Sequence, residues 1–411
     1  MNKVAIVVQR CHRSVVGGSE SLAWQYATLL REIYDVDVLT TTAVDIQDWA
    51  NALPEGLELC DGVNINRFRV TVGRTPAWGK LLEKLFDDYA NYEVGQRPAP
   101  EGVRYLPWSL ALQEEFIQKQ GPYSEPLMQF LRQRWSDYKA IIFVTYLYPT
   151  TYFGLLQVPK HHSLIAPTLH DEPTAYLSAF GHAAHRARSL IWLTDAERRV
   201  GHKLWGDLPG RVVSMSVDTE PRQAIQLESP YLLYSGRIDP NKGSRELFEY
   251  FTEFKKAHPS NLRLILTGKD DMEVPAHPDI EFRGFVPTEE KLGLMAGAKI
   301  FVMPSGNESF SIVTLEAMAQ RTPVLASNKS EVLADHIKLS GAGRIYQDYE
   351  SFAAALHEML SNEERRVELG DLGRAYAVSR HRPEHIRESL KAAVESCTEI
   401  LSDESELIVT A

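Results

Sequence analysis

The chain has little cysteine, since Cys11, Cys60 and Cys397 are its only thiols in 411 residues. An odd number of widely separated cysteines gives neither a disulfide framework nor the paired spacing of a structural zinc site. This excludes a small disulfide-stabilised fold and a zinc-ribbon protein. A reducing cytoplasm fits this cysteine usage best.

Long apolar runs are also lacking. The run Val4–Val8 is followed closely by Arg10 and Arg13, and it is too short for the apolar core of a signal peptide. No later segment is apolar over the length that a bilayer-spanning helix needs. We therefore expect a cytoplasmic protein, and peripheral contact with the inner face of a membrane stays open.

Positive charge is not in excess, because the formal net charge is −11. A protein that neutralises many phosphates is therefore not indicated, and we expect no nucleic-acid partner, although a local basic pocket stays open. Hydrophobic residues at 44% and charged residues at 24% are typical of globular proteins. At this length two domains are expected.

The first half of the sequence has a βαβ pattern. Val4–Val8 is typical of a strand buried on both faces, and the turn with Gly17 and Gly18, which allow positive φ, leads into a helix that Ser19 can cap. Further strand-like runs are Ala140–Val144, His162–Leu169 and Ser189–Thr194. These elements predict a Rossmann-like domain over residues 1–217.

An inserted helical region is expected at about residues 71–137, where the alternation loosens. Ten aromatic residues fall in it: Trp78, Phe86, Tyr89, Tyr92, Tyr105, Trp108, Phe116, Tyr123, Phe130 and Trp135. We favour rings that pack the core of the insertion. A surface that binds the acceptor or faces a membrane is the alternative.

The βαβ pattern restarts after the polar stretch Asp218–Pro230, which predicts an inter-domain linker. We expect a second Rossmann-like domain over residues 218–382 and a helix within 383–411 that packs back on the first domain. The predicted fold is α/β, with two facing doubly wound lobes and a cleft between them. Ligands of such sheets bind at the carboxyl ends of the strands.

The turn after the first strand of the second lobe, YLLYSGRIDPNKG, supplies Gly236, Arg237 and Lys242. Two cations on a glycine-containing loop at a strand end predict an anion site. The alternative is that both are ordinary surface charges.

A second constellation is PSGNESFSIVTLEAM, in which a helix is expected to begin near Ser311. Its free N–H groups at Phe310, Ser311 and Ile312 suit a diphosphate. Glu316 on the second helical turn suits the vicinal hydroxyls of a ribose, and Glu308 suits those of a sugar. Acids placed favourably near a helix start are the alternative, chiefly for Glu308.

These residues resemble the E-x7-E motif of retaining GT-B glycosyltransferases of family 4, also called glycosyltransferase group 1. SGRIDPNKG, RGFVP and GGSE occur in the order which that family shows, over nearly the whole chain. The resemblance implies that Glu316 binds the donor ribose and Glu308 the transferred sugar. It assigns the donor diphosphate to Arg237 and Lys242. It also implies that the domain over residues 1–217 lies on the acceptor side and that the domain over residues 218–382 binds the nucleotide-sugar.

The resemblance also implies further contacts. FRGFVP is similar to the segment that touches the base, so Phe285 and Val286 are candidates. Gly17 and Gly18 correspond to the glycine loop of the first lobe. PTLHDEP is similar to the strand end with an active-site histidine and supplies His170, with Asp171 beside it; a structural histidine is the alternative.

Two departures from the family pattern occur. Ser309 and Ser311 stand where glycine is common, so the backbone there approaches a ligand less closely. Ser216 stands where proline is common before Val217 and Asp218, which affects the hinge more than the chemistry.

The expected function is transfer of a sugar from a UDP- or GDP-sugar donor to a hydroxyl of a saccharide or lipid-linked acceptor, in polysaccharide or glycoconjugate biosynthesis. The resemblance implies retention of anomeric configuration; no metal and no cofactor are expected. The alternatives are a GT-B sugar-nucleotide epimerase and a non-enzymatic two-lobe sugar-binding protein. A two-lobe oxidoreductase is disfavoured because the first turn lacks G-x-G-x-x-G.

Overall fold

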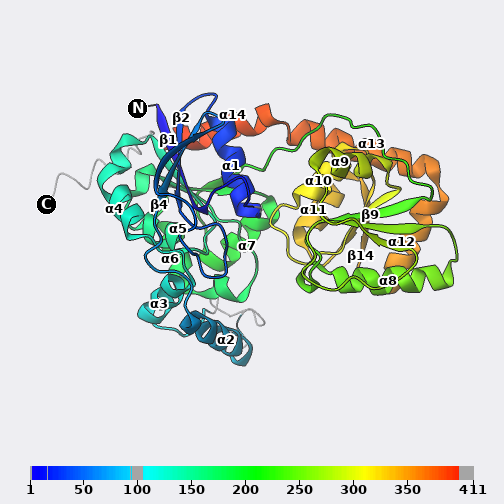
Figure 1. Ribbon diagram of the computed structural model, residues 1–411, viewed down its shortest axis with the longest axis horizontal. Helices are drawn as coiled ribbons and strands as arrows, with labels where there is room; N and C mark the ends of the chain where they lie inside the picture. Colours follow the sequence, from blue (N-terminus) through cyan, green and yellow to red (C-terminus); the bar gives the residue numbers. More distant parts are fainter. Residues whose placement is uncertain (1, 16, 93, 95–104, 398–411) are drawn as a thin grey trace. The chain divides into compact units, whose positions relative to one another are not determined.

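The computed structural model describes residues 2–15, 17–92, 94 and 105–397 (Figure 1). The chain forms two compact units, of which unit 1 comprises residues 1–214 and 386–411 and unit 2 comprises residues 215–385. The chain thus enters and leaves unit 2 once each. In the described part of the chain, no helix combines the length and apolar character needed to cross a membrane.

Unit 1 is built on an eight-stranded sheet with the order β3-β4-β2-β1-β5-β6-β7-β8, in which only β3 is antiparallel to its neighbour. The strands are β1 (Lys3–Arg10), β2 (Asp35–Thr41), β3 (Gly56–Cys60), β4 (Val63–Phe68), β5 (Ala140–Val144), β6 (Ser163–Ala166), β7 (Ser189–Trp192) and β8 (Gly210–Val212). The helices are α1 (Gly18–Leu30), α2 (Pro76–Asn91), α3 (Leu110–Gln120), α4 (Glu125–Arg134), α5 (Pro149–Leu155), α6 (Ser178–His185), α7 (Asp195–Trp205) and α14 (Pro383–Glu395), of which α14 belongs to this unit from Ile386.

Unit 2 contains a six-stranded, fully parallel sheet with the order β11-β10-β9-β12-β13-β14. Its strands are β9 (Tyr231–Ser235), β10 (Arg263–Thr267), β11 (Ile280–Phe282), β12 (Ile300–Met303), β13 (Val324–Ser327) and β14 (Gly343–Tyr346). Its helices are α8 (Ser244–Ala257), α9 (Thr288–Gly297), α10 (Ile312–Ala319), α11 (Glu331–Ser340), α12 (Tyr349–Ser361) and α13 (Glu363–Arg380). Figure 1 shows α9 and α10 on one side of β9 and α8 and α12 on the other.

The central strands are buried because apolar residues fill them from end to end, as in β5 and β9. Such runs suit a parallel sheet that is covered by helices on both faces. In both units the strand order reverses beside the first strand of the unit, β1 or β9, as in doubly wound folds. The predicted α/β fold with two Rossmann-like lobes is confirmed.

The insertion contributes α2, α3 and α4 and adds to the core of unit 1. Phe116 and Trp108 are buried in that core, and Trp78 packs against it with its ring centre 6.1 Å from that of Phe116. Phe86 and Tyr92 are about half exposed. Most of the described rings therefore serve core packing, and residues 93 and 95–104 of the expected insertion lie outside the described residues.

Helix α14 closes unit 1. Glu395 accepts a hydrogen bond from the Tyr34 hydroxyl at 2.6 Å and pairs with Lys139, and Arg387 pairs with Glu32. Residues 398–411 of the expected C-terminal segment lie outside the described residues.

The stretch 218–230, in which we expected a linker, lies in unit 2 and is bound to it. The Gln320 side chain accepts a hydrogen bond from the N–H of Arg222 at 2.8 Å and donates one to the carbonyl of Glu220 at 2.9 Å. Ile225 donates its N–H to the carbonyl of Gly293 at 2.9 Å. These bonds fix the start of unit 2 against α9 and α10.

Candidate active site in unit 2

Two loops of unit 2 carry most of the expected donor-site residues. One follows β9 and holds Gly236, Arg237 and Lys242; the other follows β12 and holds Glu308. β9 and β12 are hydrogen-bonded neighbours at the point where the strand order reverses. Both loops therefore leave the carboxyl ends of adjacent strands, where doubly wound sheets bind ligands.

Backbone geometry at Gly243 holds these two loops close together. Gly243 has φ +73°, and a Cβ at this position would lie 2.4 Å from the carbonyl oxygen of Pro304. A side chain would therefore force apart the loops that carry Lys242 and Glu308. Gly236 also has a positive φ, +154°, which an L side chain rarely adopts.

Lys242 and Glu308 form an ion pair with 2.7 Å between Nζ and Oε1. The same ammonium donates to the carbonyl of Asn307 at 3.1 Å. The side chain of Glu308 is only 10% exposed, so water screens the pair weakly. The structure thus brings Glu308, which we expect to bind the sugar, into contact with Lys242, which we expect to bind the diphosphate.

Arg237 is half exposed and lies between two acids. Its Nε is 3.4 Å from an Asp239 oxygen and 3.8 Å from an Asp271 oxygen. Asp271 also pairs with Lys269 at 2.8 Å, and this hydrogen bond is the largest cause that lowers the pKa of Asp271. The guanidinium is oriented by long ionic contacts that a stronger anion could replace.

The loop before α10 approaches the helix through a strained residue. Ser311 is the N-cap and has φ +62° and ψ +62°, the left-handed region that glycine enters at least cost. Its hydroxyl lies 2.9 Å from that of Thr314. The structure therefore gives a physical reason why glycine is favoured here, and half-buried Ser309 precedes it in the same loop.

The N–H groups expected to receive an anion stay available in the described residues. None of those of Phe310, Ser311 and Ile312 donates to another described residue. They lie at the positive end of α10, which begins at Ile312. This arrangement can accept phosphate oxygens.

A buried histidine, which we did not identify from the sequence, holds this loop. His336 Nε2 lies 2.9 Å from the carbonyl oxygen of Phe310, and its Nδ1 lies 3.0 Å from the Tyr376 hydroxyl. A carbonyl only accepts, so the proton is on Nε2 and Tyr376 donates to Nδ1. Burial lowers the pKa of His336, which favours this neutral form.

Glu316 lies on α10 and is paired with Lys291 of α9. The Lys291 ammonium is 2.8 Å from Oε1 and 2.7 Å from Oε2 of the carboxylate. Burial raises the pKa of Glu316, and the charge of Lys291 opposes this rise. Lys291 was missed because nothing local marks it, although it follows the expected base-binding segment by a few residues.

That segment connects β11 to α9. The side chain of Phe285 is 75% exposed, a large value for an aromatic ring, and Val286 next to it is partly buried. In the sequence, α9 and β12 separate this ring from α10 and its buried Glu316. An exposed aromatic ring of this kind fits a platform for a planar base. The structure leaves this role a prediction.

In unit 1 the structure gives a different reason for glycine at residue 17 from the one that we expected. Gly17 has an extended φ of −172° and is itself the N-cap of α1, so the expectations of positive φ and of a Ser19 cap were wrong. A Cβ on Gly17 would lie 2.1 Å from a carboxylate oxygen of Glu20, whereas one on Gly18 would meet nothing within 4 Å. Gly17 thus leaves room for Glu20, which pairs with Arg10.

His170 and Asp171 lie in the loop after β6 of unit 1. His170 is partly buried. The carboxylate of Asp171 is held by the Tyr176 hydroxyl and by Lys203, both at 2.7 Å. This pairing gives Asp171 a structural role, and any contact with a ligand stays a prediction.

The loop before His170 is fixed by Glu197, another residue not identified from the sequence. Glu197 is fully buried in α7 and accepts the N–H of Leu169 at 2.7 Å and that of Leu193. Burial raises the pKa of Glu197 to about 8, and the backbone hydrogen bonds oppose the rise. Glu197 therefore orients the end of β6 rather than acting on a ligand.

No group of three or more His, Cys, Asp or Glu in the described residues is arranged to hold a metal ion. The adjacent acids Asp270 and Asp271 are exposed, and Asp271 is engaged by Lys269 and Arg237.

Two Rossmann-like units with paired acids at the switch point of the second define the GT-B class of glycosyltransferase folds. Residues 218–376 match the family described as glycosyl transferases group 1. This match bears out the resemblance over the part of the chain that contains Arg237, Lys242, Glu308 and Glu316.

Parts of the chain are similar in sequence to glycosyltransferases that are known by name. The D-inositol 3-phosphate glycosyltransferase of Kineococcus radiotolerans is 29% identical over 239 residues, which are 48% of this chain and 55% of that protein. The O-antigen chain mannosyltransferase B of Escherichia coli is 33% identical over 118 residues, 26% of this chain and 31% of that protein. The matches thus span about half or less of these relatives.

Solved structures show the same fold over nearly the whole chain. Sucrose-phosphate synthase from Thermosynechococcus elongatus has a TM-score of 0.67 at 16% identity and covers 96% of this chain and 98% of its own. Anabaena HepE, in complex with UDP and glucose, has a TM-score of 0.66 at 14% identity, and the match covers 96% of this chain and 100% of the HepE chain.

Proposed function

We propose that the protein is a glycosyltransferase that moves a sugar from a nucleoside diphosphate to an acceptor hydroxyl with retention of anomeric configuration. The observation that carries the proposal is the pairing of the two motif acids with lysines. Lys242 holds Glu308 and Lys291 holds Glu316, before and within α10 of a group 1 glycosyltransferase domain.

Each group has a role in the proposed donor site. The two oxygens of Glu316 accept the vicinal hydroxyls of the ribose, and Phe285 and Val286 contact the base. Arg237, Lys242 and the N–H groups at the start of α10 receive the diphosphate. Glu308 binds hydroxyls of the transferred sugar, and His170 of unit 1 is assigned to the sugar or the acceptor.

The chemical step exchanges one C–O bond for another. The acceptor oxygen forms a bond to the anomeric carbon, the bond from this carbon to the β-phosphate oxygen breaks, and the nucleoside diphosphate leaves. Attack on the same face retains the configuration, and an oxygen of the leaving phosphate takes the acceptor proton. Charge grows on that phosphate, where preorganised cations and N–H groups stabilise it most.

The names of similar proteins support the choice of substrates. The complex of HepE contains UDP and glucose, and several relatives are named as D-inositol 3-phosphate glycosyltransferases. A UDP-sugar is therefore our first choice of donor. The O-antigen mannosyltransferase supports a role in polysaccharide or glycoconjugate biosynthesis.

A thermal-shift panel of UDP-, GDP- and ADP-sugars tests donor binding. A ligand at one hundred times its Kd stabilises the folded protein by about 2.7 kcal/mol, which raises the midpoint temperature of thermal unfolding measurably. Glu316→Ala should weaken binding of that nucleotide about tenfold or more in a folded protein. Unchanged affinity would remove Glu316 from the site.

The reaction itself separates the alternatives. Mass spectrometry should show an acceptor heavier by one sugar, and NMR of the product should show the anomeric configuration of the donor. Hydrolysed or isomerised donor without acceptor would favour a sugar-nucleotide epimerase. A protein that binds free sugar but no nucleotide would favour a binding protein.

A further inference from the structure

The peptide group that links Phe310 to Ser311 is held by a buried histidine through its carbonyl, while its N–H is left open. Nε2 of His336 donates to the Phe310 carbonyl over 2.9 Å. The N–H of Ser311, which belongs to the same peptide group, donates to no other described residue. In a trans peptide the C=O and N–H bonds point in opposite directions. The bond to His336 therefore fixes the direction in which the Ser311 N–H points.

The side chain of Phe310 is anchored independently of this peptide. It is 3% exposed, and its ring centre lies 6.0 Å from that of His336 and 5.6 Å from that of His381. A shift of this ring would leave a void in a packed cluster, which is costly. The loop can therefore change most readily by rotation of the peptide plane between Phe310 and Ser311, which leaves both side chains near their places.

The conformation of Ser311 favours such a rotation. Its φ of +62° lies in the left-handed region, which strains a residue with a Cβ. Rotation of the peptide plane by about half a turn brings φ to a negative value that serine adopts without strain. The rotated peptide presents its carbonyl to the proposed phosphate site in place of its N–H. A carbonyl oxygen and a phosphate oxygen are both acceptors, so the rotated peptide disfavours the ligand.

His336 and Tyr376 oppose the rotation. The Tyr376 hydroxyl donates to Nδ1 of His336 over 3.0 Å, which places the imidazole proton on Nε2. His336 is 4% exposed, so rotation of the Phe310 carbonyl would leave a buried donor without its acceptor. The loss of this hydrogen bond offsets the release of strain at Ser311.

We propose that His336 is a positioning residue that keeps the peptide before Ser311 in the orientation that offers its N–H to a phosphate oxygen of the donor. His336 itself touches no substrate, and Tyr376 selects the tautomer that can donate. The inference rests on the proposed function, which assigns the diphosphate to the start of α10. It specifies that the phosphate groups of the donor, and not its base, lose affinity when His336 is changed.

The first test compares UDP with uridine, which has no phosphate. Calorimetry measures UDP, and saturation-transfer NMR measures uridine. His336→Phe keeps a buried ring and removes the donor, whereas His336→Gln supplies an amide N–H of similar reach. We expect His336→Phe to weaken UDP binding about tenfold and to leave uridine binding unchanged, and His336→Gln to recover most of the loss. The matched control is His162→Phe in unit 1, where Nδ1 of His162 lies 2.8 Å from the Tyr138 carbonyl oxygen; it should bind UDP as the wild type does.

A double-mutant cycle separates positioning from packing. Ser311→Gly removes the strain that drives the rotation. In that background His336→Phe should weaken UDP binding by only about threefold, because the peptide gains less by turning. An equal loss in both backgrounds would show that His336 acts through packing alone. Where His336→Phe impairs folding, Tyr376→Phe replaces it in the cycle, since it removes one hydroxyl and frees the other tautomer.

The Ser311 amide reports the orientation directly. In protein labelled with ¹⁵N-serine, UDP and inorganic pyrophosphate should each shift the Ser311 N–H signal, which Ser311→Ala identifies, and His336→Phe should abolish both shifts. No shift with either probe in the wild type, or equal losses of UDP and uridine in His336→Phe, would overturn the inference. A shift with pyrophosphate in a protein that binds no nucleotide would refute the proposed function and leave the positioning role standing. Wild-type UDP affinity in folded His336→Phe would do the reverse.

Discussion

The ammonium of Lys291 lies within 2.8 Å of both carboxylate oxygens of Glu316. One cation thus occupies both positions at which ribose hydroxyls are proposed to bind. Its charge opposes the rise that burial causes in the pKa of Glu316, and it orients the carboxylate before the ligand arrives. The ligand must then share these oxygens.

Lys291→Met should therefore change the pH dependence of nucleotide binding. Without the ammonium, burial raises the pKa of Glu316 further, and the protonated acid accepts hydroxyls poorly. We expect UDP affinity at neutral pH to fall about tenfold and to recover as the pH rises, since the carboxylate ionises again. Calorimetry across pH measures this. Lys256→Met, an exposed lysine of α8, is the control, and a loss of affinity independent of pH would contradict the role.

Glu308→Gln should separate binding from turnover. The variant removes the acid that competes for Lys242, so UDP affinity should stay the same or rise by about twofold to fivefold. The kcat for sugar transfer should fall, since Glu308 is proposed to bind the sugar. His170→Ala should likewise lose turnover and retain UDP. Wild-type kcat in both variants would place neither residue in the active site.

Sugar transfer should survive EDTA. Arg237, Lys242 and the α10 N-terminus can neutralise a diphosphate without a divalent ion, and Asp271 is engaged by Lys269 and Arg237. Arg237→Ala or Lys242→Ala should therefore reduce kcat more than Asp271→Asn does. Activity that EDTA abolishes and Mg²⁺ or Mn²⁺ restores would show this assignment to be wrong.

Acid should destabilise unit 2 through His381. Burial lowers the pKa of His381 to about 3, and the neighbouring His336, Arg380 and His385 add to the shift. An unfolded histidine takes up its proton near pH 6.5, so stability is complete above that pH and declines below it. The loss is about 2 kcal/mol at pH 5. Urea unfolding at several pH values should show a flatter profile for His381→Phe, whose ring can still contact Phe310.

Ser311 allows a test of backbone strain. Ser311→Ala keeps the left-handed conformation and loses the hydroxyl contact with Thr314, whereas Ser311→Gly loses the same contact but relieves the strain. We expect the alanine variant to be less stable than the glycine variant by about 1 kcal/mol. Equal midpoints in urea would indicate that the loop rearranges.

The strands and loops that carry the proposed donor site could be predicted from the sequence because their signals are local. β9 and β12 are short buried runs, and α10 is a largely apolar segment that follows a polar loop. Lys291 and His336 could not be predicted, because they meet Glu316 and Phe310 across 25 and 26 residues. Only the folded sheet brings such residues together.

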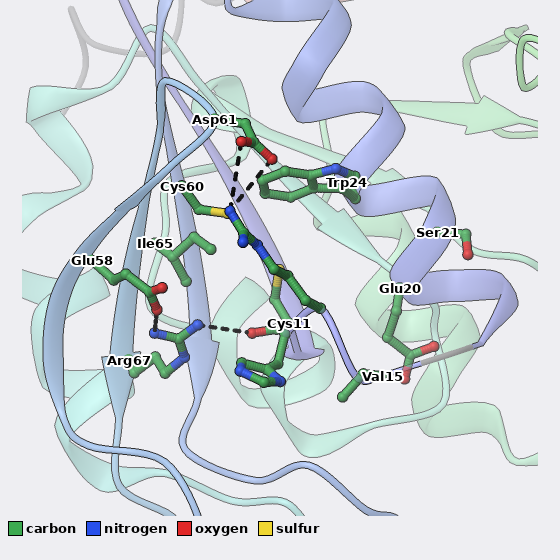
Figure 2. Close-up of a pocket in the computed structure, with 12 residues that line it drawn as sticks. Cys11, Val15, Glu20, Ser21, Trp24, Glu58, Cys60, Asp61, Ile65 and Arg67 are labelled. Carbon is green, nitrogen blue, oxygen red and sulfur yellow. Dashed lines mark hydrogen bonds and ion pairs between the residues drawn. The ribbon is translucent and has the colours of Figure 1, made fainter.

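The β3–β4 hairpin was also not predicted. Leu57 and Leu59 of β3 are 70% exposed, whereas Glu58 between them lines a cavity of unit 1 together with Cys11 and Trp24 (Figure 2). Apolar residues thus point outward at the edge of the sheet. This reverses the pattern that marks a strand with a buried apolar face. The hairpin forms one wall of that cavity. The cavity therefore could not be predicted from the sequence either.

The division of the chain has a consequence for its synthesis. Unit 2 is one continuous segment, whereas unit 1 includes α14, which follows unit 2 in the sequence and binds Tyr34, Lys139 and Glu32. Nearly all of unit 2 is therefore synthesised before α14. Domains generally fold as units once their whole segment has been synthesised. Unit 2 can therefore finish folding while unit 1 still lacks α14. The second unit along the chain can then be the first to complete its fold.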